Sequence, residues 1–287
     1  MRLALLPKSC KLELPKVLSE KSLHSVLGSA LWATTATPLA HQLTEILVSL
    51  KSIYERIEAD KSTYKQEDAK VQDLLGMYAR WLKHFKREGS TTTYVYALPM
   101  HAECILFTDA AFVQDRSKAK CTGQIFIFGE NGEPVYISSF SRKSQRTCQS
   151  PLGAELLSVI DGVNFLEHIQ EIYRQFHGML VINTICMDNY GILSHASKNH
   201  SKVQRGLVSK AYYYIKGKSK ELDFTICHTA GKGNPADVGT KSSCDLDSWY
   251  NLSKMVIGIW PSIMIECPGK VRRFLGTVKR IYYGLAV

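Results

Sequence analysis

The chain has 287 residues, and its hydrophobic fraction of 45% is ordinary for a globular protein, which suits one or two domains and argues against wholesale disorder. Its 36 lysines and arginines outnumber 26 acidic residues, and the net charge of +10 favours polyanionic partners. Many basic proteins bind nothing charged, so charge alone identifies no partner.

The cysteines and the apolar segments indicate an intracellular protein. No two of the eight cysteines form a Cys-x-x-Cys pair, and no Cys/His spacing suggests zinc. Several lie in apolar, strand-like runs, where a free cysteine behaves as a small hydrophobe, and this fits a reducing compartment. The apolar runs at the N-terminus and in residues 255–265 are too short for a signal peptide or a membrane span. We therefore expect a cytoplasmic or nuclear protein without a membrane partner.

The first hundred residues are expected to be helical, because apolar residues recur there at helical spacing in three stretches. The stretches are Leu23, Val26, Leu27 and Leu31; Leu43, Ile46, Leu47, Leu50, Ile53 and Ile57; and Val71, Leu74, Leu75, Tyr78, Trp81, Leu82 and Phe85. Pro38 precedes the second stretch, and the polar, glycine-containing segment 87–93 is expected to be a linker. Three amphipathic helices predict a small bundle over residues 1–97.

Beyond the linker the pattern changes to strands alternating with helices. The predicted strands are 104–108, 124–128, 134–140, 179–187 and 222–227, and a helix is predicted over 203–215. Asn131-Gly132 is a strong hairpin signal, and Ser150 followed by Pro151 predicts the start of another helix. The order β-β-β-α-β-α-β predicts an α/β domain with a mixed sheet, hairpins first and crossovers after.

Four carboxylates fall at the ends of these elements. Asp109 and Asp188 each directly follow a predicted strand, Glu155 lies in the first turns of the helix after Ser150, and Asp237 lies beyond the last strand. Neighbouring strands would bring Asp109 and Asp188 to the sheet edge where open α/β proteins bind ligands. Carboxylates are the ligands that Mg²⁺ prefers, and two such ions about 4 Å apart promote phosphodiester cleavage. The alternative is a set of solvated surface acids, which are common at strand ends.

The motifs around these acids resemble those of retroelement ribonucleases H. FTDAAF (107–112) is similar to their first-strand T-D-A-S/A motif, and SPLGAELLSVIDGV (150–163) resembles the E-L-L-A-V helix of gypsy-type enzymes. CMDNYGIL (186–193) is similar to the strand that ends in T-D-N/S. HTAGKGNPADVGTK (228–241) resembles the H-x-x-G-x-x-N-x-A-D-x-x-[ST]-[KR] signature of LTR retrotransposons. The four motifs keep the family's order over roughly residues 103–245.

The resemblance implies a ribonuclease H-like fold over residues 100–247: a mixed five-stranded sheet with flanking helices, its first three strands antiparallel. It also implies an enzyme that cuts the RNA strand of RNA–DNA hybrids with two Mg²⁺ ions, with Mn²⁺ as an alternative ion. The implied catalytic residues and metal ligands are Asp109, Glu155, Asp188 and Asp237. Asp109 would bridge both ions, Glu155 and Asp188 would complete one site, and Asp237 the other. Met187 departs from the Thr or Ser common in the family, at a position that is not a ligand.

Two further residues near the motifs have less defined roles. Some retroviral members place a mobile histidine shortly before the last aspartate, where it assists product release, which makes His228 a candidate catalytic residue. His228 lies nearer the strand end, so a structural or substrate-contacting role is the alternative. Asp161, about one and a half turns past Glu155, is expected to be ordinary surface on another helix face.

Basic residues supply the expected substrate contacts. A run without acids extends from Lys198 to Lys220 and contains three tyrosines, and a second cluster precedes Ser150. Hybrid duplexes are held largely through backbone and 2′-hydroxyl contacts, so such faces suit a sequence-tolerant nuclease. A solvated basic helix face is the alternative. The residues predicted to bind nucleic acid are Arg142, Lys143, Arg146, Lys198, Lys202, Arg205 and Lys210.

The N-terminal region carries a shorter resemblance. SLHSVLGSALW (22–32) is similar to the L-x-x-x-L-G-x-x-x-[YW] segment where a retrotransposon polymerase passes from thumb to connection. The alternative is an ordinary helix that packs closely at Gly28. Because no Y-x-D-D or F-x-D-D motif occurs, we expect no polymerase active site in the chain.

The resemblance implies the C-terminal part of a reverse transcriptase. Its partners would be an RNA–DNA hybrid and the polymerase portion, in a cytoplasmic retroelement particle or in the nucleus. The predicted domains are a thumb/connection-like region over 1–97, a ribonuclease H-like domain over 100–247 and a basic C-terminal tail over 248–287. One alternative function is a weak or inactive nucleic-acid-binding or assembly module. Another nuclease of the superfamily, such as an integrase, is disfavoured by the N-P-A-D signature and the order of the four acids.

Overall fold

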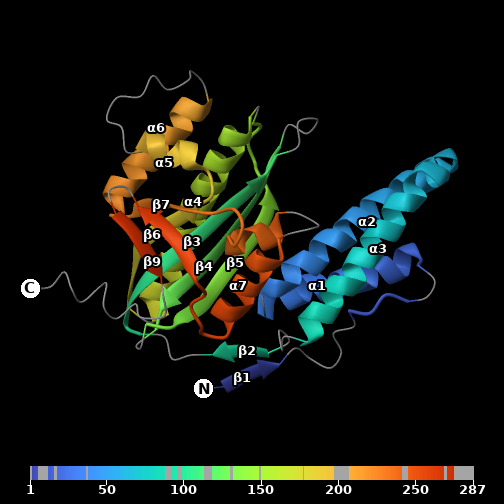
Figure 1. Ribbon diagram of the computed structural model, residues 1–287, viewed down its shortest axis with the longest axis horizontal. Coiled ribbons are helices and arrows are strands. Elements are labelled where there is room, and N and C mark those ends of the chain that lie inside the picture. Colours follow the sequence, from blue (N-terminus) through green and yellow to red (C-terminus); the bar gives the residue numbers. More distant parts are fainter. Residues whose placement is uncertain are drawn as a thin grey trace, which may run out of the picture. The chain divides into compact units, whose positions relative to one another are not determined.

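The computed structural model shows two compact units, one built mainly from residues 2–95 and the other from residues 96–240 and 245–287 (Figure 1). The residues it describes are 2–5, 12–15, 18–36, 38–87, 92–95, 99–112, 118–129, 132–148, 150–176, 178–196, 207–240, 245–267 and 270–274. Within these ranges no helix has the length and apolarity needed to cross a lipid bilayer.

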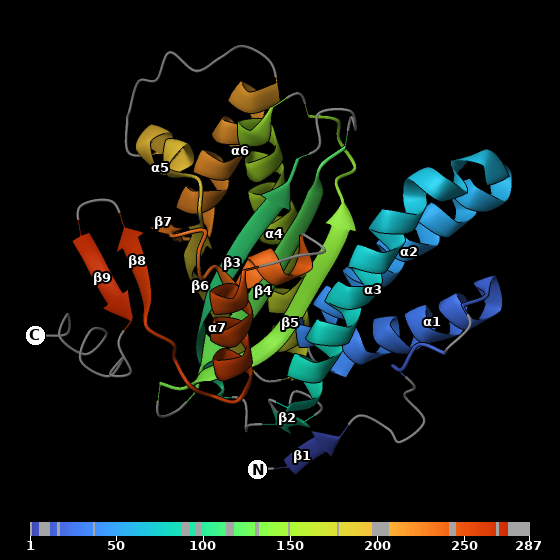
Figure 2. The same cartoon turned by 45° about the vertical axis from the view of Figure 1, so that its right-hand side comes forward.

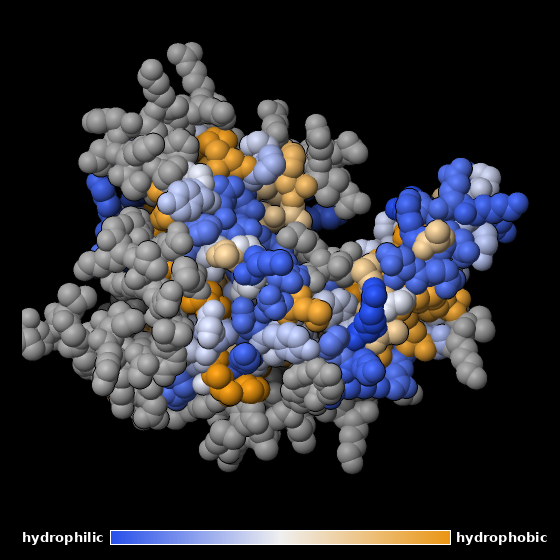
Figure 3. Space-filling view, viewed as in Figure 1, coloured by the Kyte–Doolittle hydropathy of each residue, from blue (hydrophilic) through white to orange (hydrophobic). Residues whose placement is uncertain are grey.

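The N-terminal unit contains the three predicted helices. They are α1 (Glu20–Ala36), α2 (His41–Ala59) and α3 (Tyr64–Arg87), with short 3₁₀ helices at Pro38–Ala40 and Lys61–Thr63. Their apolar stripes form the interior, where Leu43, Leu47 and Phe85 are at most 1% exposed. Exposed residues near the turn between α2 and α3 are mostly hydrophilic, as Figure 3 shows. The prediction of three amphipathic helices is confirmed, because the predicted apolar positions are buried or half-buried, with the exception of Leu31, which is 50% exposed.

A small sheet completes this unit and was not predicted. Strand β1 (Arg2–Leu5) pairs antiparallel with β2 (Thr92–Val95). The segment predicted as a linker therefore contributes Thr92 and Thr93 to a strand. β-Branched threonines favour extended backbone, which the polarity of the segment concealed.

The C-terminal unit is built on a seven-stranded mixed sheet in the order β5-β4-β3-β6-β7-β8-β9 (Figure 2). The strands are β3 (His101–Ala111), β4 (Lys120–Phe128), β5 (Pro134–Lys143), β6 (Met179–Met187), β7 (Thr225–Thr229), β8 (Ile263–Cys267) and β9 (Lys270–Phe274). Strands β3, β4 and β5 are antiparallel, whereas β6 runs parallel to β3 and β7 parallel to β6. These five strands confirm the predicted fold class, a mixed α/β sheet with flanking helices.

Strands β8 and β9 extend the sheet beyond the five predicted strands and correct the prediction of a basic tail over 248–287. The described part of that segment contains most of helix α7 (Leu246–Val256) as well as β8 and β9. Trp249, Leu252 and Met255 recur at helical spacing and are at most 1% exposed.

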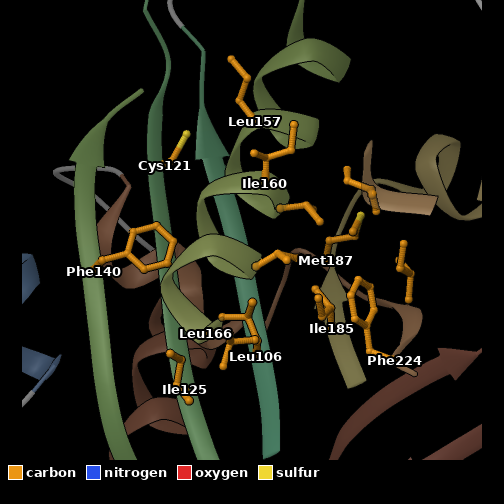
Figure 4. Packing of buried hydrophobic residues seen from close by; sticks show 14 of the residues in the cluster. Leu106, Cys121, Ile125, Phe140, Leu157, Ile160, Leu166, Ile185, Met187 and Phe224 are labelled. Atoms are coloured by element: carbon orange, nitrogen blue, oxygen red, sulfur yellow. The ribbon is translucent and has the colours of Figure 1, made fainter. Parts of the chain in front are cut away.

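Helix α4 (Pro151–Phe176) packs on β3, β4 and β6 and forms the centre of the core, shown in Figure 4. The Oγ atom of Ser150 accepts a hydrogen bond from the Gly153 N–H at 3.1 Å, so the predicted helix start is confirmed. A Cβ atom at Gly162 would lie 2.7 Å from Cδ2 of Leu106. Glycine at this position therefore lets α4 approach β3 closely enough to bring its first turns to the sheet edge.

Two further helices flank the sheet, α5 (Tyr190–Ala196) and α6 (Leu207–Glu221), and α6 packs against α4. The predicted strand at 222–227 begins only at Thr225 in the structure. Asp223 has a left-handed φ of 52°, which ends the helical turn and delays the strand. The part of the predicted helix at 203–206 lies outside the described residues.

The cysteines only partly match the expectation of free thiols. Cys104, Cys121, Cys148 and Cys186 are free and buried, and burial raises the pKa of each of the last three thiols. Cys227, in β7, is disulfide-bonded.

Candidate metal centre

Strands β3 and β6 carry two of the predicted acids to one edge of the sheet. They are parallel neighbours, and Phe107 pairs with Cys186, so Asp109 and Asp188 each lie two residues further along. The two strands are thus neighbours, which was the condition for bringing both acids to one edge. Asp109 is not beyond its strand as predicted, because pairing with β4 continues through Ala111. Pairing of Asp109 with Thr122 of β4 consequently fixes the backbone at Asp109.

Three carboxylates converge at this edge. Asp109, Glu155 and Asp188 each offer an oxygen, and these oxygens lie within 4.8 Å of one another. Asp109 is 2% exposed and Glu155 8%. Helix α4 supplies Glu155 and, one turn later, Ser158, whose hydroxyl donates to the main-chain oxygen of Asp109 at 2.7 Å. The same helix face thus brings one acid to the site and fastens the helix to the strand that carries another.

The fourth predicted acid, Asp237, is linked to this group without being one of the three. It lies in the 3₁₀ helix η3 (Pro235–Gly239) and is 5% exposed. Thr240 connects the two acids: its Oγ1 atom lies 2.5 Å from Oδ2 of Asp109 and 3.4 Å from Oδ1 of Asp237. The structure therefore brings all four predicted acids to one region and separates them into a close triad and a fourth member.

Helix η3 is fastened to three neighbouring strands. Asn234 donates to the main-chain oxygen of Thr108 in β3 at 3.0 Å. Hydroxyls of Thr122 in β4 and Ser141 in β5 donate to the main-chain oxygens of Ala236 and Gly239, each at 2.8 Å. Buried hydrogen bonds of this kind leave the segment little freedom, so Asp237 is held relative to Asp109 by the sheet itself.

These fastening residues were missed as functional positions. Asn234 and Thr240 stand at fixed places of the N-x-A-D-x-x-[ST] pattern, so the motif contained a signal for them. Ser158, Thr122 and Ser141 had none, because a buried serine or threonine in a strand or helix looks the same in sequence whatever its hydroxyl contacts.

Gly231 leaves room for the carboxylate of Asp188. A Cβ atom at Gly231 would lie 2.9 Å from Oδ2 of Asp188 and 3.6 Å from its Cβ. The loop after β7 therefore forms a wall beside the carboxylate that only glycine can provide without displacing it. The donor set, carboxylate oxygens alone, suits a hard divalent cation such as Mg²⁺.

His228 lies beside the backbone of Asp188 and outside the triad. Its Nε2 atom is 3.1 Å from the main-chain oxygen of Asp188, and its ring meets the Tyr190 ring edge-on with centroids 5.3 Å apart. The ring is partly buried. These contacts match the structural alternative stated for His228, and a catalytic role stays a prediction.

The basic residues before α4 are exposed, and one of them is anchored. Arg142 lies over the Phe140 ring at 5.3 Å, and its Nη2 atom is 3.4 Å from Oδ1 of Asp161. The Asp161 side chain is only 16% exposed, so the expectation that it is ordinary surface is wrong. Lys143 and Arg146 are also exposed. Arg142 lies near the end of β5 and pairs with Cys121 of β4, one of the strands on which α4 packs, so its side chain can contact Asp161 of α4.

Lys120 was not predicted and belongs to the same end of the sheet. It pairs with Lys143 across β4 and β5. Burial, and then the charge of Lys143, lower the pKa of Lys120 from its ordinary 10.5 to about 7.

On α6, Lys210 is exposed as predicted for a nucleic-acid contact, and Tyr213 is 65% exposed. Tyr212 is buried in the core, and the Tyr214 hydroxyl donates to Asn164 at 2.6 Å. Of the three tyrosines, Tyr212 therefore packs in the interior, Tyr214 connects α6 to α4, and Tyr213 is exposed. Lys198, Lys202 and Arg205 lie outside the described residues.

The sequence matches no family model and no curated protein. Among solved structures, LC11-RNase H1, isolated from compost by a metagenomic approach, is 16% identical, with 47% of this chain and 90% of that chain covered at a TM-score of 0.32. Its complex with RNA/DNA hybrid gives 16% identity, coverage of 46% and 88%, and a TM-score of 0.33. RNase H1 from the halophilic archaeon Halobacterium salinarum NRC-1 is 12% identical, with 47% and 90% covered at a TM-score of 0.34. At such low TM-scores the fold assignment rests on the strand order and register of the chain itself.

Proposed function

We propose that the chain is a divalent-metal-dependent nuclease that cuts the RNA strand of RNA–DNA hybrids, as the C-terminal part of a retroelement reverse transcriptase. The observation that carries the proposal is the triad of Asp109, Glu155 and Asp188, whose oxygens lie within 4.8 Å of one another at a sheet edge. Three ionised carboxylates so close repel each other, and a cation between them removes that repulsion.

The site fits small, hard cations. Mg²⁺ is usually held by one or two carboxylates and keeps several waters, which the partly exposed Asp188 allows. Divalent ions bound here would supply an activated water and neutralise charge on the scissile phosphate. Asp109, Glu155 and Asp188 would hold one ion. Asp237, which like Asp109 contacts the Thr240 hydroxyl, would hold the second ion together with Asp109.

Cationic side chains at the same end of the sheet support a nucleic-acid substrate. Ala110, next to Asp109, pairs with Cys121, which in turn pairs with Arg142, and Lys120 pairs with Lys143. At a strand spacing of about 4.8 Å, the Arg142 backbone lies about 10 Å across the sheet from Ala110. Phosphates flanking a scissile bond at the acids would therefore pass within reach of these side chains.

The motif resemblance supports the finer parts of the proposal. The four motifs favour RNA–DNA hybrid as the substrate, and the segment 22–32 favours a position after a polymerase thumb. A retroelement particle in the cytoplasm, or the nucleus, would be the place of action, and Mn²⁺ would be able to replace Mg²⁺.

Cleavage of a labelled RNA–DNA hybrid with Mg²⁺ tests the proposal. We expect RNA-strand cleavage by the intact chain, none with EDTA, and none by Asp109→Asn. The matched control is Asp247→Asn, an exposed acid on α7, which should cleave like the unmodified chain. DNA and RNA duplexes in the same assay identify the preferred strand.

The alternative function, a nucleic-acid-binding or assembly module, has its own outcome in this experiment. If the unmodified chain and Asp109→Asn both bind the hybrid in a salt-dependent way and neither cleaves it, the binding module is favoured and the nuclease proposal is refuted. The convergence of three acids at the sheet edge supports the nuclease, because a module that only binds phosphates gains nothing from clustered negative charge.

A further inference from the structure

We infer that Thr240 is a positioning residue that couples Asp237 to Asp109 and thereby sets the affinity of the second metal ion. The inference rests on the proposed function and deepens it, because the motif resemblance assigns no role to this threonine. It follows from how one buried hydroxyl contacts two of the four acids.

The hydroxyl of Thr240 has three acceptors within reach. Its Oγ1 atom lies 2.5 Å from Oδ2 of Asp109, 3.1 Å from the main-chain oxygen of Asp237 and 3.4 Å from Oδ1 of Asp237. A hydroxyl has one hydrogen to donate, and the shortest contact has the length of a charge-assisted bond to a carboxylate. Thr240 therefore donates to Asp109 and keeps Asp237 within contact distance.

The position of this hydroxyl is fixed by its surroundings. Thr240 is 5% exposed and caps η3, with its N–H donating to the main-chain oxygen of Asp237 at 3.2 Å. The β-branched side chain has few rotamers, and η3 is fastened by Thr122 and Ser141. Asp109 thus meets a donor whose place is set by β4 and β5, and the plane of its carboxylate is oriented before any ion binds.

Loss of the hydroxyl would act on the two ion positions unequally. Asp109 is 2% exposed, so without Thr240 its Oδ2 atom loses a donor that water cannot readily replace. Glu155 and Asp188 still define the first position, whereas the second depends on the relative placement of Asp109 and Asp237. Removal of a group that orients a metal ligand commonly weakens metal binding about 10- to 100-fold.

Titration with Mn²⁺, followed by the EPR signal of the free ion, tests this inference without relying on cleavage. We expect the unmodified chain to bind two Mn²⁺ ions. Thr240→Val should keep the tighter ion and bind the weaker one about 10-fold less tightly or worse. Thr240→Ser, which restores the hydroxyl, should recover most of the lost affinity.

The matched control is Thr229→Val. Thr229 is 1% exposed, and its Oγ1 atom has no hydrogen-bond partner within the described ranges, so its loss should leave Mn²⁺ binding unchanged. Should Thr240→Val fail to fold, Thr240→Cys tests the same expectation, because a thiol of similar volume is only a weak donor.

The outcomes separate this inference from the proposed function. Unchanged binding of both ions by Thr240→Val, or equal weakening of both ions, overturns the role of Thr240, while hybrid cleavage by the unmodified chain leaves the nuclease standing. An unmodified chain that neither binds Mn²⁺ nor cleaves hybrid overturns the nuclease and the inference together.

Discussion

Substituting Gly231 with alanine should damage the metal centre while leaving the fold intact. The new Cβ atom would lie 2.9 Å from Oδ2 of Asp188, about 0.5 Å inside an ordinary contact of about 3.4 Å. Metal–ligand distances tolerate only about 0.2 Å of variation. The carboxylate must therefore turn or shift by more than an ion can accept, and we expect at least about a 10-fold loss of metal affinity.

The same change should cost little stability. Among the described glycines, Gly233 has a left-handed φ of 100°, whereas the φ of Gly231 is not left-handed. Alanine therefore suits the backbone at position 231. The displaced atom is the end of a side chain, which can rotate. Reduced entropy of the unfolded chain offsets part of the strain.

The assay compares hybrid cleavage as a function of Mg²⁺ concentration with thermal unfolding in EDTA. Gly231→Ala should need about 10-fold more Mg²⁺ for half-maximal cleavage, with Tm close to that of the unmodified chain. Gly76→Ala is the control, because a Cβ atom there meets nothing within 4 Å and α3 should gain about 1 kcal/mol of stability. Cleavage by Gly231→Ala at unchanged Mg²⁺ would refute the role of Asp188 as a ligand.

Three further predictions address other parts of the C-terminal unit. The free energy of unfolding should rise between pH 7 and 10.5, because in that window Lys120 is protonated in the unfolded chain and increasingly neutral in the folded one. Denaturant titrations across this pH range should show a flatter rise for Lys120→Met. Arg142→Ala should weaken hybrid binding and reduce the slope of log K against log salt by about one, whereas an unchanged slope would remove Arg142 from the binding surface. Trp249→Ala should cost about 3–5 kcal/mol in urea unfolding, because the side chain is 1% exposed; a cost under about 1 kcal/mol would mean that α7 is not part of the core.

The sequence predicted the parts of the fold whose pattern is periodic. The hydrophobic run 179–187 coincides with β6, and Ser150 caps α4 as expected, because a buried parallel strand and a capped helix each leave a local signal. Strands β8 and β9 were missed because two five-residue strands inside a basic segment have no distinctive period. The place of β8 beside β7 depends on pairing with a partner distant in the chain, and β9 then pairs with β8.

In the candidate site, too, the sequence revealed what has a local signal and not what depends on contacts between distant segments. The acids were found because each occupies a motif on a defined element. Their grouping was not predictable at this detail, since whether Asp237 joins the triad depends on where Asn234, Thr122 and Ser141 fasten η3. A motif identifies the residues that ligate, while hydroxyls without any motif decide their relative placement.

The placement of the acids also reduces their mutual repulsion when no cation is bound. Negative charge near Asp109 is countered in part by hydroxyl donation from Thr240, whereas Asp188 is only partly buried and can be solvated. The triad is therefore arranged so that the most buried carboxylate carries the fixed donor and the least buried one faces water. The Asp109 side of the centre is thus built by the sheet and η3, and the Asp188 side is bounded by the loop at Gly231.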